Sequence, residues 1–479
     1  MFSIRRSLAW MTLSQGVLFV MQFGVSIVLA RLLSPYEFGV FTFAMAIVSL
    51  LSILRQVGLT SYLVRAPHLT PALLSSLFTI NAAIALFIAA VIAGLSVLGG
   101  AALGEPGLRQ VLGIMVLLPL IGIFDFIPGS MIERAGNFRA TAMINMLRSF
   151  VSQVLVVVLA FAGYSYMSLA YGTIVGALIA LVCANLVGRA HITLRPGLHD
   201  WRHITRFGLH MLAVTGIGVI AARMAELAMA RLLGLSALGL YSRATGLYGM
   251  LWDNVHLVIA RIVFVDLTEK RRQGVSLRGS YLRTMEMTTA VLWPAFAGLA
   301  ITAGPVITTL YGAQWSEAAL PLSLLCLGAI VLVSITLTWE VFVVSEETGR
   351  QARLESVRAG AGLLMFVLGC LSGIAAAAAA RIGEALLARA LYRPHLERLT
   401  DTRRADFRPI YGKSLALTLI AVAPAAGVMA AHGFAASTSL LYIAPAALLG
   451  VVLWAAALVG LAHPLADEGR RVLAGLRTR

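Results

Sequence analysis

Ionisable side chains inside otherwise apolar stretches are the residues of this sequence that could do chemistry. The chief candidates among them are five arginines and two carboxylates: Arg55, Arg148, Arg223, Arg243, Arg261, Glu226 and Asp253. A guanidinium group binds phosphate through paired hydrogen bonds and keeps its proton. An excess of arginine at membrane depth therefore predicts a cleft that binds an anionic headgroup, with the five arginines as its ligands. Glu226 or Asp253 would carry coupling protons or sodium.

The same residues have a second interpretation as interhelical or local ion pairs. Arg223 and Glu226 are three positions apart and could neutralise each other on one helix face. Arg381 and Glu384 have the same spacing, which favours a local ion pair over a site. Arg358 falls near a predicted helix end, where a long cationic side chain reaches the headgroups. Asp125 is a further carboxylate at depth.

Two glutamines add a polar stripe to the first apolar run. Gln15 and Gln22 are seven positions apart and share a face of a helix. They would line the cleft or hydrogen-bond to a neighbouring helix, and the spacing does not separate these alternatives.

The elements that must position these residues are membrane-spanning helices. The chain has 479 residues, of which 59% are hydrophobic and 12% charged, whereas a soluble domain carries about 25% charged residues. The composition predicts an all-α integral membrane protein with about 14 transmembrane helices. The expected spans are 8–33, 38–64, 73–102, 110–132, 140–162, 166–188, 207–231, 238–266, 285–310, 318–344, 356–372, 375–392, 413–431 and 440–463. The span 375–392 is the weakest because it carries Arg381, Glu384 and Arg389.

The loops give the expected orientation. With this set of spans, most of the 37 basic residues fall in the tails and loops of one side, and the opposite loops hold Arg31, Arg109 and Arg231. Basic loops mark the cytoplasmic side. Both termini are therefore expected in the cytoplasm, and the net charge of +16 is explained by topology and anionic lipids rather than by nucleic acid.

A segment that predicts a bend between two helices occurs twice in the sequence. The segment ARLLSPYEFGVFTFA begins at Ala30, and ARLLGLSALGLYSRA begins at Ala230. Six spans separate the two copies, so both halves run in the same direction. This predicts two six-helix lobes in parallel repeat, residues 1–200 and 201–400, followed by two additional helices and a tail in residues 401–479.

Enzyme motifs are missing from the sequence. No phosphate-binding P-loop, HExxH, CxxC or GxSxG pattern occurs. We therefore expect a transporter with no cofactor and no metal, other than coupling to H⁺ or Na⁺.

The first bend also carries a family resemblance. ARLLSPYEFGVFTFAMAIVSLLSILRQVGLTSYLVR (Ala30–Arg65) resembles the opening of the bacterial polysaccharide transporters, which include O-antigen and exopolysaccharide flippases. These belong to the multidrug/oligosaccharidyl-lipid/polysaccharide (MOP) exporter superfamily. Relatives often have an acidic residue before the GL of the second span, where this chain has Arg55 and Gln56.

The resemblance implies a function. It implies a flippase that moves an undecaprenyl-diphosphate-linked oligosaccharide from the cytoplasmic to the periplasmic leaflet of the bacterial inner membrane by alternating access. Implied partners are this lipid, membrane lipids, a polysaccharide polymerase and chain-length proteins. An ion-coupled multidrug or lipid exporter of the same superfamily is the first alternative, and a membrane-embedded sugar polymerase or ligase is the second.

Overall fold

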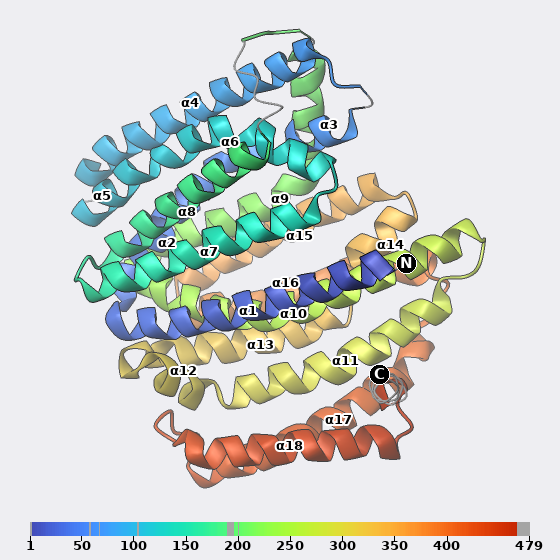
Figure 1. Ribbon diagram of the computed structural model, residues 1–479. Helices are drawn as coiled ribbons and strands as arrows, with labels where there is room; N and C mark the ends of the chain where they lie inside the picture. Colours follow the sequence, from blue (N-terminus) through green and yellow to red (C-terminus); the bar gives the residue numbers. More distant parts are fainter. Residues whose placement is uncertain are drawn as a thin grey trace. The chain divides into compact units, whose positions relative to one another are not determined.

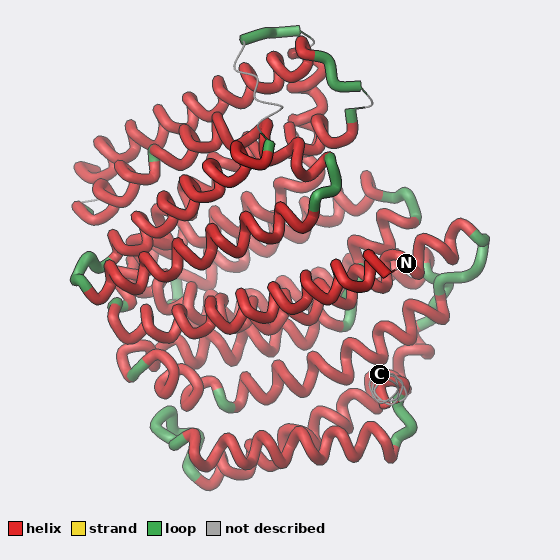
Figure 2. The backbone as a smooth tube through the Cα atoms, in the orientation of Figure 1, coloured by secondary structure: helices red, strands yellow, loops and turns green. Residues whose placement is uncertain are grey.

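The computed structural model describes residues 2–56, 59–66, 68–102, 105–188, 196–199 and 201–466, and every described element is a helix (Figures 1 and 2). The chain divides into two compact units, Met1–Gly239 (unit 1) and Leu240–Arg479 (unit 2). The all-α architecture predicted from the sequence is confirmed.

The described residues of unit 1 form nine helices and the first turn of a tenth. These are α1 (Phe2–Leu32), α2 (Pro35–Gln56), α3 (Leu59–Arg65), α4 (Pro71–Ala102), α5 (Pro106–Met115), α6 (Leu117–Arg134), α7 (Phe138–Phe161), α8 (Tyr166–Val187), α9 (Trp201–Leu233) and the start of α10 (Leu235–Arg272). One core cluster of unit 1 joins Val40 and Ala44 of α2 with Ile88 of α4 and Met115 of α5.

Unit 2 contains the rest of α10 and the helices that follow. These are α11 (Arg278–Ile301), α12 (Ala303–Tyr311), the short 3₁₀ helix η2 (Ala313–Ala318), α13 (Ala319–Val333), α14 (Thr338–Val344), α15 (Thr348–Cys370), α16 (Ile374–Leu399), α17 (Arg404–Ala431) and α18 (Leu440–Gly460). One core cluster of unit 2 contains the aromatic residues Tyr281, Phe342, Tyr392 and Phe407 among aliphatic side chains.

Nine of the described helical segments are long and apolar enough to cross a membrane. They are 35–55, 71–97, 106–134, 139–161, 166–187, 278–301, 313–344, 404–431 and 440–460. Helices α9, α10, α15 and α16 are long but fall outside this set, and among the described residues of α1 the apolar stretch is Leu18–Leu32. The count of fourteen spans stays a prediction.

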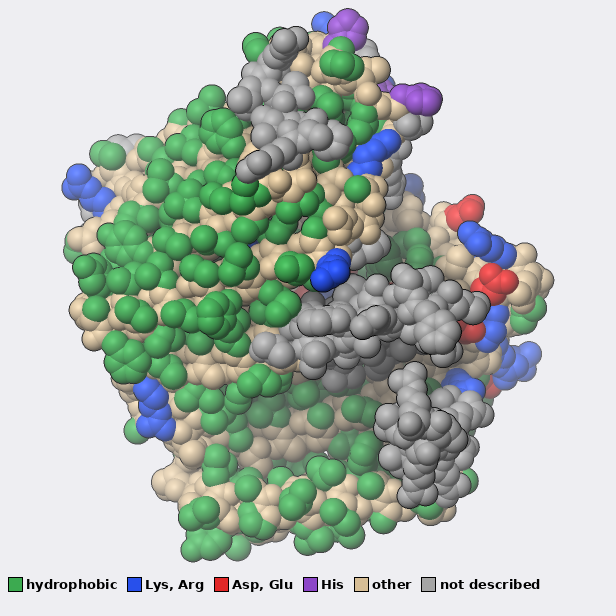
Figure 3. All heavy atoms as spheres, viewed as in Figure 1, with side chains coloured by type: hydrophobic (Ala, Val, Ile, Leu, Met, Phe, Trp, Pro, Cys, Tyr) green, Lys and Arg blue, Asp and Glu red, His purple; other side chains and the backbone are tan. Residues whose placement is uncertain are grey.

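Apolar side chains are exposed along the flanks of the helices. In unit 1, Figure 3 shows hydrophobic side chains over α4, α7 and α8, and the exposed residues there include Phe87, Phe150 and Val182. Charged side chains gather instead at helix ends, as at the basic last turn of α10. A helix flank covered with exposed apolar residues is the surface expected in contact with lipid.

The two copies of the repeated bend form by different local chemistry. In the first, Pro35 begins α2, and the Ser34 backbone N–H donates to the Glu37 carboxylate at 2.7 Å. The Glu37 N–H donates in return to the Ser34 hydroxyl at 3.3 Å, which is a capping box. In the second, Gly234 adopts φ +88°, a left-handed conformation that ends α9.

The bends pack against each other through their glycines. A Cβ added at Gly39 would lie 1.9 Å from the Leu235 carbonyl oxygen, and one added at Gly239 would lie 1.9 Å from that of Pro35. Both contacts fall within unit 1. The contact is reciprocal, so the repeat seen in the sequence is also a repeat in packing. No side chain fits at either glycine without a shift of backbone.

Candidate functional site

The candidate site lies in unit 1, where three ionisable side chains come from three helices. Arg55 is in the last turn of α2, Asp125 is in the middle of α6, and Arg148 is in α7. The carboxyl group of Asp125 lies within the electrostatic reach of both guanidinium groups. Arg55 and Arg148, which interact electrostatically with Asp125, are two of the five arginines that the sequence predicted for an anionic ligand.

Arg55 lies against a glycine of α6. A Cβ built on Gly122 would be 1.5 Å from one guanidinium nitrogen of Arg55, so the guanidinium in this position occupies the space that a larger residue at 122 would need. Asn81 of α4 is fully buried and donates its amide N–H to the Gly122 carbonyl oxygen at 3.3 Å. The Oδ1 atom of Asn81 is buried and has no hydrogen-bond partner. A buried unsatisfied acceptor costs about 1–3 kcal/mol.

The charges of this cluster do not cancel. Within the described part of the chain, neither Arg55 nor Arg148 forms an ion pair with a carboxylate at contact distance, although Asp125 is near both. Arg55 is half-buried and Arg148 is exposed. Two guanidinium groups and one carboxylate leave a net positive charge, which suits an anion.

Arg223 and Glu226 pair with each other on α9 in unit 1. The Arg223 guanidinium donates to both Glu226 oxygens, at 2.9 and 2.7 Å. Their side chains are 34% and 24% exposed. The local neutralisation that the spacing allows is thus formed in the structure.

Arg243 lies in unit 2 and is 6% exposed. Its guanidinium carbon is 5.4 Å from the centroid of the Tyr311 ring and 5.5 Å from that of Trp315. A cation held over aromatic faces is stabilised by the ring quadrupoles. This arginine is therefore committed to the packing of α10 against α12 and η2.

The structure gives less information about the remaining predicted residues. Asp253 is an exposed residue of α10, and Gln22 is an exposed residue of α1. The side chains of Gln15 and Arg261 lie outside the described part of the structure.

A second charge cluster, in unit 2, joins α15 to α16. Arg381 donates to Glu384 at 2.6 Å, as the three-residue spacing predicted. Arg358 also donates to Glu384 and, at 2.9 Å, to Glu355. The expectation that Arg358 extends to the headgroups is wrong, because the Glu384 carboxylate lies within reach from the neighbouring helix.

Small residues make this unit 2 cluster possible. A Cβ on Gly362 of α15 would lie 2.6 Å from the carboxyl carbon of Glu384, so glycine leaves the space that the carboxylate fills. Tyr392 donates its hydroxyl to Glu355 at 2.8 Å. The sequence signal that could have found this cluster is the combination of a glycine on one long helix with a carboxylate on the next.

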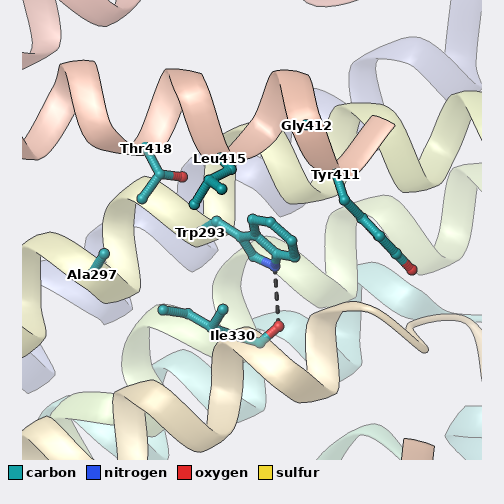
Figure 4. A pocket seen from close by; sticks show the side chains of 7 residues that line it. All are labelled: Trp293, Ala297, Ile330, Tyr411, Gly412, Leu415 and Thr418. Carbon is teal, nitrogen blue, oxygen red and sulfur yellow. Dashed lines mark hydrogen bonds between the residues drawn. The ribbon is translucent and has the colours of Figure 1, made fainter. Parts of the chain in front are cut away.

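Unit 2 also has an apolar pocket of about 540 Å³ between α11, α13 and α17 (Figure 4). Its lining residues are Trp293, Ala297, Ile330, Tyr411, Gly412, Leu415 and Thr418. The indole N–H of Trp293 donates to the Ile330 carbonyl oxygen at 3.0 Å across the pocket. No charged residue is among the lining residues, so this pocket does not provide a site for an anion.

Among the described residues, no group of three or more His, Cys, Asp or Glu side chains could hold a metal ion.

Comparisons of the chain with a family model and with known proteins agree with one another. A family model described as "Polysaccharide biosynthesis protein" matches residues 28–320. The succinoglycan biosynthesis transport protein ExoT of Rhizobium meliloti is 29% identical over 69% of this chain and 67% of its own. The lipopolysaccharide biosynthesis protein WzxC of Escherichia coli is 22% identical over 64% of this chain and 62% of its own, which is less than two thirds of that relative.

Among solved structures, the chain is similar to the lipid II flippase MurJ in an inward closed conformation. The TM-score is 0.76 at 12% identity, over 93% of this chain and 97% of that one. At this identity the likeness concerns the fold. It covers nearly the whole length of both chains.

Proposed function

Because the chain belongs to the polysaccharide biosynthesis protein family, we propose that it is a flippase for an undecaprenyl-diphosphate-linked oligosaccharide. The family resemblance predicted from the sequence is confirmed, and the protein is a multi-pass membrane protein with the helical fold of flippases. Its relatives are named for transport and biosynthesis of polysaccharides, which supports a transporter rather than an enzyme.

The observation that carries the proposal is the pair Arg55 and Arg148 in unit 1. Each guanidinium comes from an apolar helix and has no carboxylate at ion-pair distance among the described residues. Keeping such groups at membrane depth costs several kcal/mol unless they face water or a ligand. A lipid diphosphate supplies the oxygens that two guanidinium groups can bind. A cationic drug would instead be repelled by this cluster.

The transport cycle in this proposal is alternating access. The two lobes, residues 1–200 and 201–400, would form a parallel repeat and rock against each other. Residues 401–479 would be an addition to the two lobes. The substrate would pass from the cytoplasmic to the periplasmic leaflet of the inner membrane, with both termini in the cytoplasm. Glu226 or Asp253 would carry a coupling H⁺ or Na⁺. A polymerase and chain-length proteins would receive the product.

The test uses arginine variants in a strain that lacks the chromosomal copy. We expect Arg55→Gln and Arg148→Gln to lower export of the surface polysaccharide and binding of undecaprenyl diphosphate by about 10- to 100-fold, since a hydrogen bond to a charged group contributes about 1.5–3 kcal/mol. Arg139→Gln is the matched control, because Arg139 lies in the first turn of the same helix, α7, away from Arg148. Export and binding at the wild-type level in both variants would refute the anion site.

A further inference from the structure

The apolar segment 313–344 of unit 2 is interrupted by a break in its helix. Helix α13 ends at Val333, α14 begins at Thr338, and the four residues between them form turns. The last of these, Leu337, has φ +62° and is 1% exposed. The left-handed conformation is costly for a residue with a Cβ and persists where the surrounding structure holds it. The fold of unit 2 therefore maintains a costly bend inside an apolar span.

Side chains from two other helices hold this break. Arg393 of α16 donates to the Ser334 carbonyl oxygen at 3.2 Å, and the Tyr411 hydroxyl of α17 donates to the same oxygen at 3.1 Å. Arg389 of α16 donates to the Ser334 hydroxyl at 2.9 Å. A backbone carbonyl that leaves a helix at membrane depth needs such donors. Because the α-helical hydrogen bonds do not continue across the break, α14 can move without unwinding α13.

The short helix α14 (Thr338–Val344) also has a left-handed residue at its other end. Glu346, two residues after the helix, has φ +59°. Between the two bends, Val341 and Phe342 are fully buried, and the Phe342 ring centroid lies 6.0 Å from that of Tyr392 on α16. Apolar packing thus holds α14 in the core of unit 2, and a costly backbone conformation flanks it on each side.

Glu340 lies on α14 and is 5% exposed. Within the described part of the chain, no residue forms a hydrogen bond or an ion pair with its carboxyl group. Glu384, the other buried acidic side chain there, binds both Arg358 and Arg381. A carboxyl group buried without a partner destabilises the position that buries it, and such a group inside a membrane span is typical of a functional site. Its backbone and this carboxyl group therefore both disfavour the packed position of α14.

We propose that α14 is a switching element of unit 2, which leaves its packed position during the transport cycle and brings Glu340 into contact with water. The packed state buries Val341 and Phe342, whereas the released state relieves the two left-handed residues and solvates the carboxyl group. Opposing contributions of this kind keep two states close in free energy, as a switch requires. Glu340 is a positioning residue that sets this balance and does not bind the substrate. The inference rests on the proposed function, since it gives the flippase a moving part.

Thiol labelling of the full chain in membranes measures the movement. Val341→Cys places a thiol on the buried face of α14, and the native Cys326 of α13, which is also 0% exposed, is the internal control. A thiol reacts with a maleimide as the thiolate, which forms in contact with water. We expect the thiol at position 341 to be labelled about tenfold faster than Cys326, because local opening exposes one and not the other. Equal protection of the two thiols would overturn the proposal.

Glu340→Met tests the role of the carboxyl group. Methionine has a similar length and no charge, so the packed state should become more stable. We expect labelling at position 341 to slow by about tenfold and polysaccharide export to fall, while binding of undecaprenyl diphosphate to the purified chain stays at the wild-type level. Glu317→Gln, an exposed residue of η2 near the other end of the same span, should match the wild type in all three measurements.

The outcomes separate this inference from the proposed function. Unchanged labelling and export in Glu340→Met, with the expected loss of binding in Arg55→Gln, would overturn the role of α14 and leave the proposed function standing. Unchanged binding in Arg55→Gln and Arg148→Gln would overturn the proposed function itself. If Glu340→Met does not fold, the comparison of position 341 with Cys326 in the chain that retains Glu340 decides whether α14 moves.

Discussion

The two charge clusters, one in each unit, contain similar residues in different states of pairing. In unit 2, Arg358 and Arg381 share Glu384, whose side chain is 11% exposed, and Arg358 also binds Glu355. In unit 1, Asp125 interacts electrostatically with Arg55 and Arg148, and neither arginine has an ion pair at contact distance within the described residues. Two arginines thus meet two carboxylates in one cluster and one carboxylate in the other.

The difference shows that an arginine inside a membrane helix does not by itself mark a ligand site. A buried ion pair whose hydrogen bonds are satisfied is complete and needs no ligand. An arginine whose charge is only partly balanced retains a cost that a ligand can remove. The Arg381 guanidinium, which also lies 4.5 Å from the Phe366 ring centroid, belongs to the first kind, and Arg55 belongs to the second.

The largest effect is expected from Glu384→Gln. The change leaves Arg358 and Arg381 without their shared carboxylate, and breaking a buried pair costs about 3–5 kcal/mol. The free energy of unfolding in detergent should fall by that amount, while affinity for undecaprenyl diphosphate in the surviving folded protein stays unchanged. Weaker ligand binding with intact stability would place a ligand site in unit 2 and break the comparison.

Arg55→Met should have the opposite signature. It removes a half-buried cation that has no contact ion pair, so the free energy of unfolding should stay the same or rise by about 1 kcal/mol. Binding of the lipid diphosphate should be lost. A thermal-shift series beside the binding assay measures both, and a strongly destabilised variant would mean that Arg55 is as fully paired as Arg358.

The pair Arg223–Glu226 should lie between these extremes. It is a three-residue pair on one helix and is partly exposed, so a double-mutant cycle with Arg223→Gln and Glu226→Gln should give a coupling energy of about 0.5 kcal/mol. If Glu226→Gln instead abolishes export while stability is kept, Glu226 acts in ion coupling, as proposed from the sequence.

The smallest effect concerns His463, which follows α18 in unit 2. Burial, together with nearby Lys413, lowers the pKa of His463, although Glu286 acts in the opposite direction. The native state therefore binds fewer protons at this residue than the unfolded state, and stability should fall as the pH drops below about 6.5. His463→Gln should weaken this dependence, measured as the melting temperature between pH 7.5 and 5.5. An unchanged pH profile would assign the dependence to other groups.

Local patterns of the sequence predicted local structure well. Hydropathy gave helical spans, and the three-residue spacing of Arg381 and Glu384 gave their ion pair, since both depend on neighbours along one helix. The bond from Arg358 to Glu384 joins residues 26 positions apart, and the sequence analysis missed it. It also missed Asn81, because a lone asparagine in an apolar run carries no signal of what lies opposite.

By itself, the sequence determined that this protein is an all-helical membrane protein with a similar bend segment in each half. Within lipid, a helix forms all the hydrogen bonds of its own backbone, so each span is expected to be helical. Glycines recur where two backbones come into close contact. The tertiary structure decided which buried arginines are balanced. Pairing depends on which helices lie side by side and on where a glycine leaves room, as Gly122 does for Arg55 and Gly362 does for Glu384.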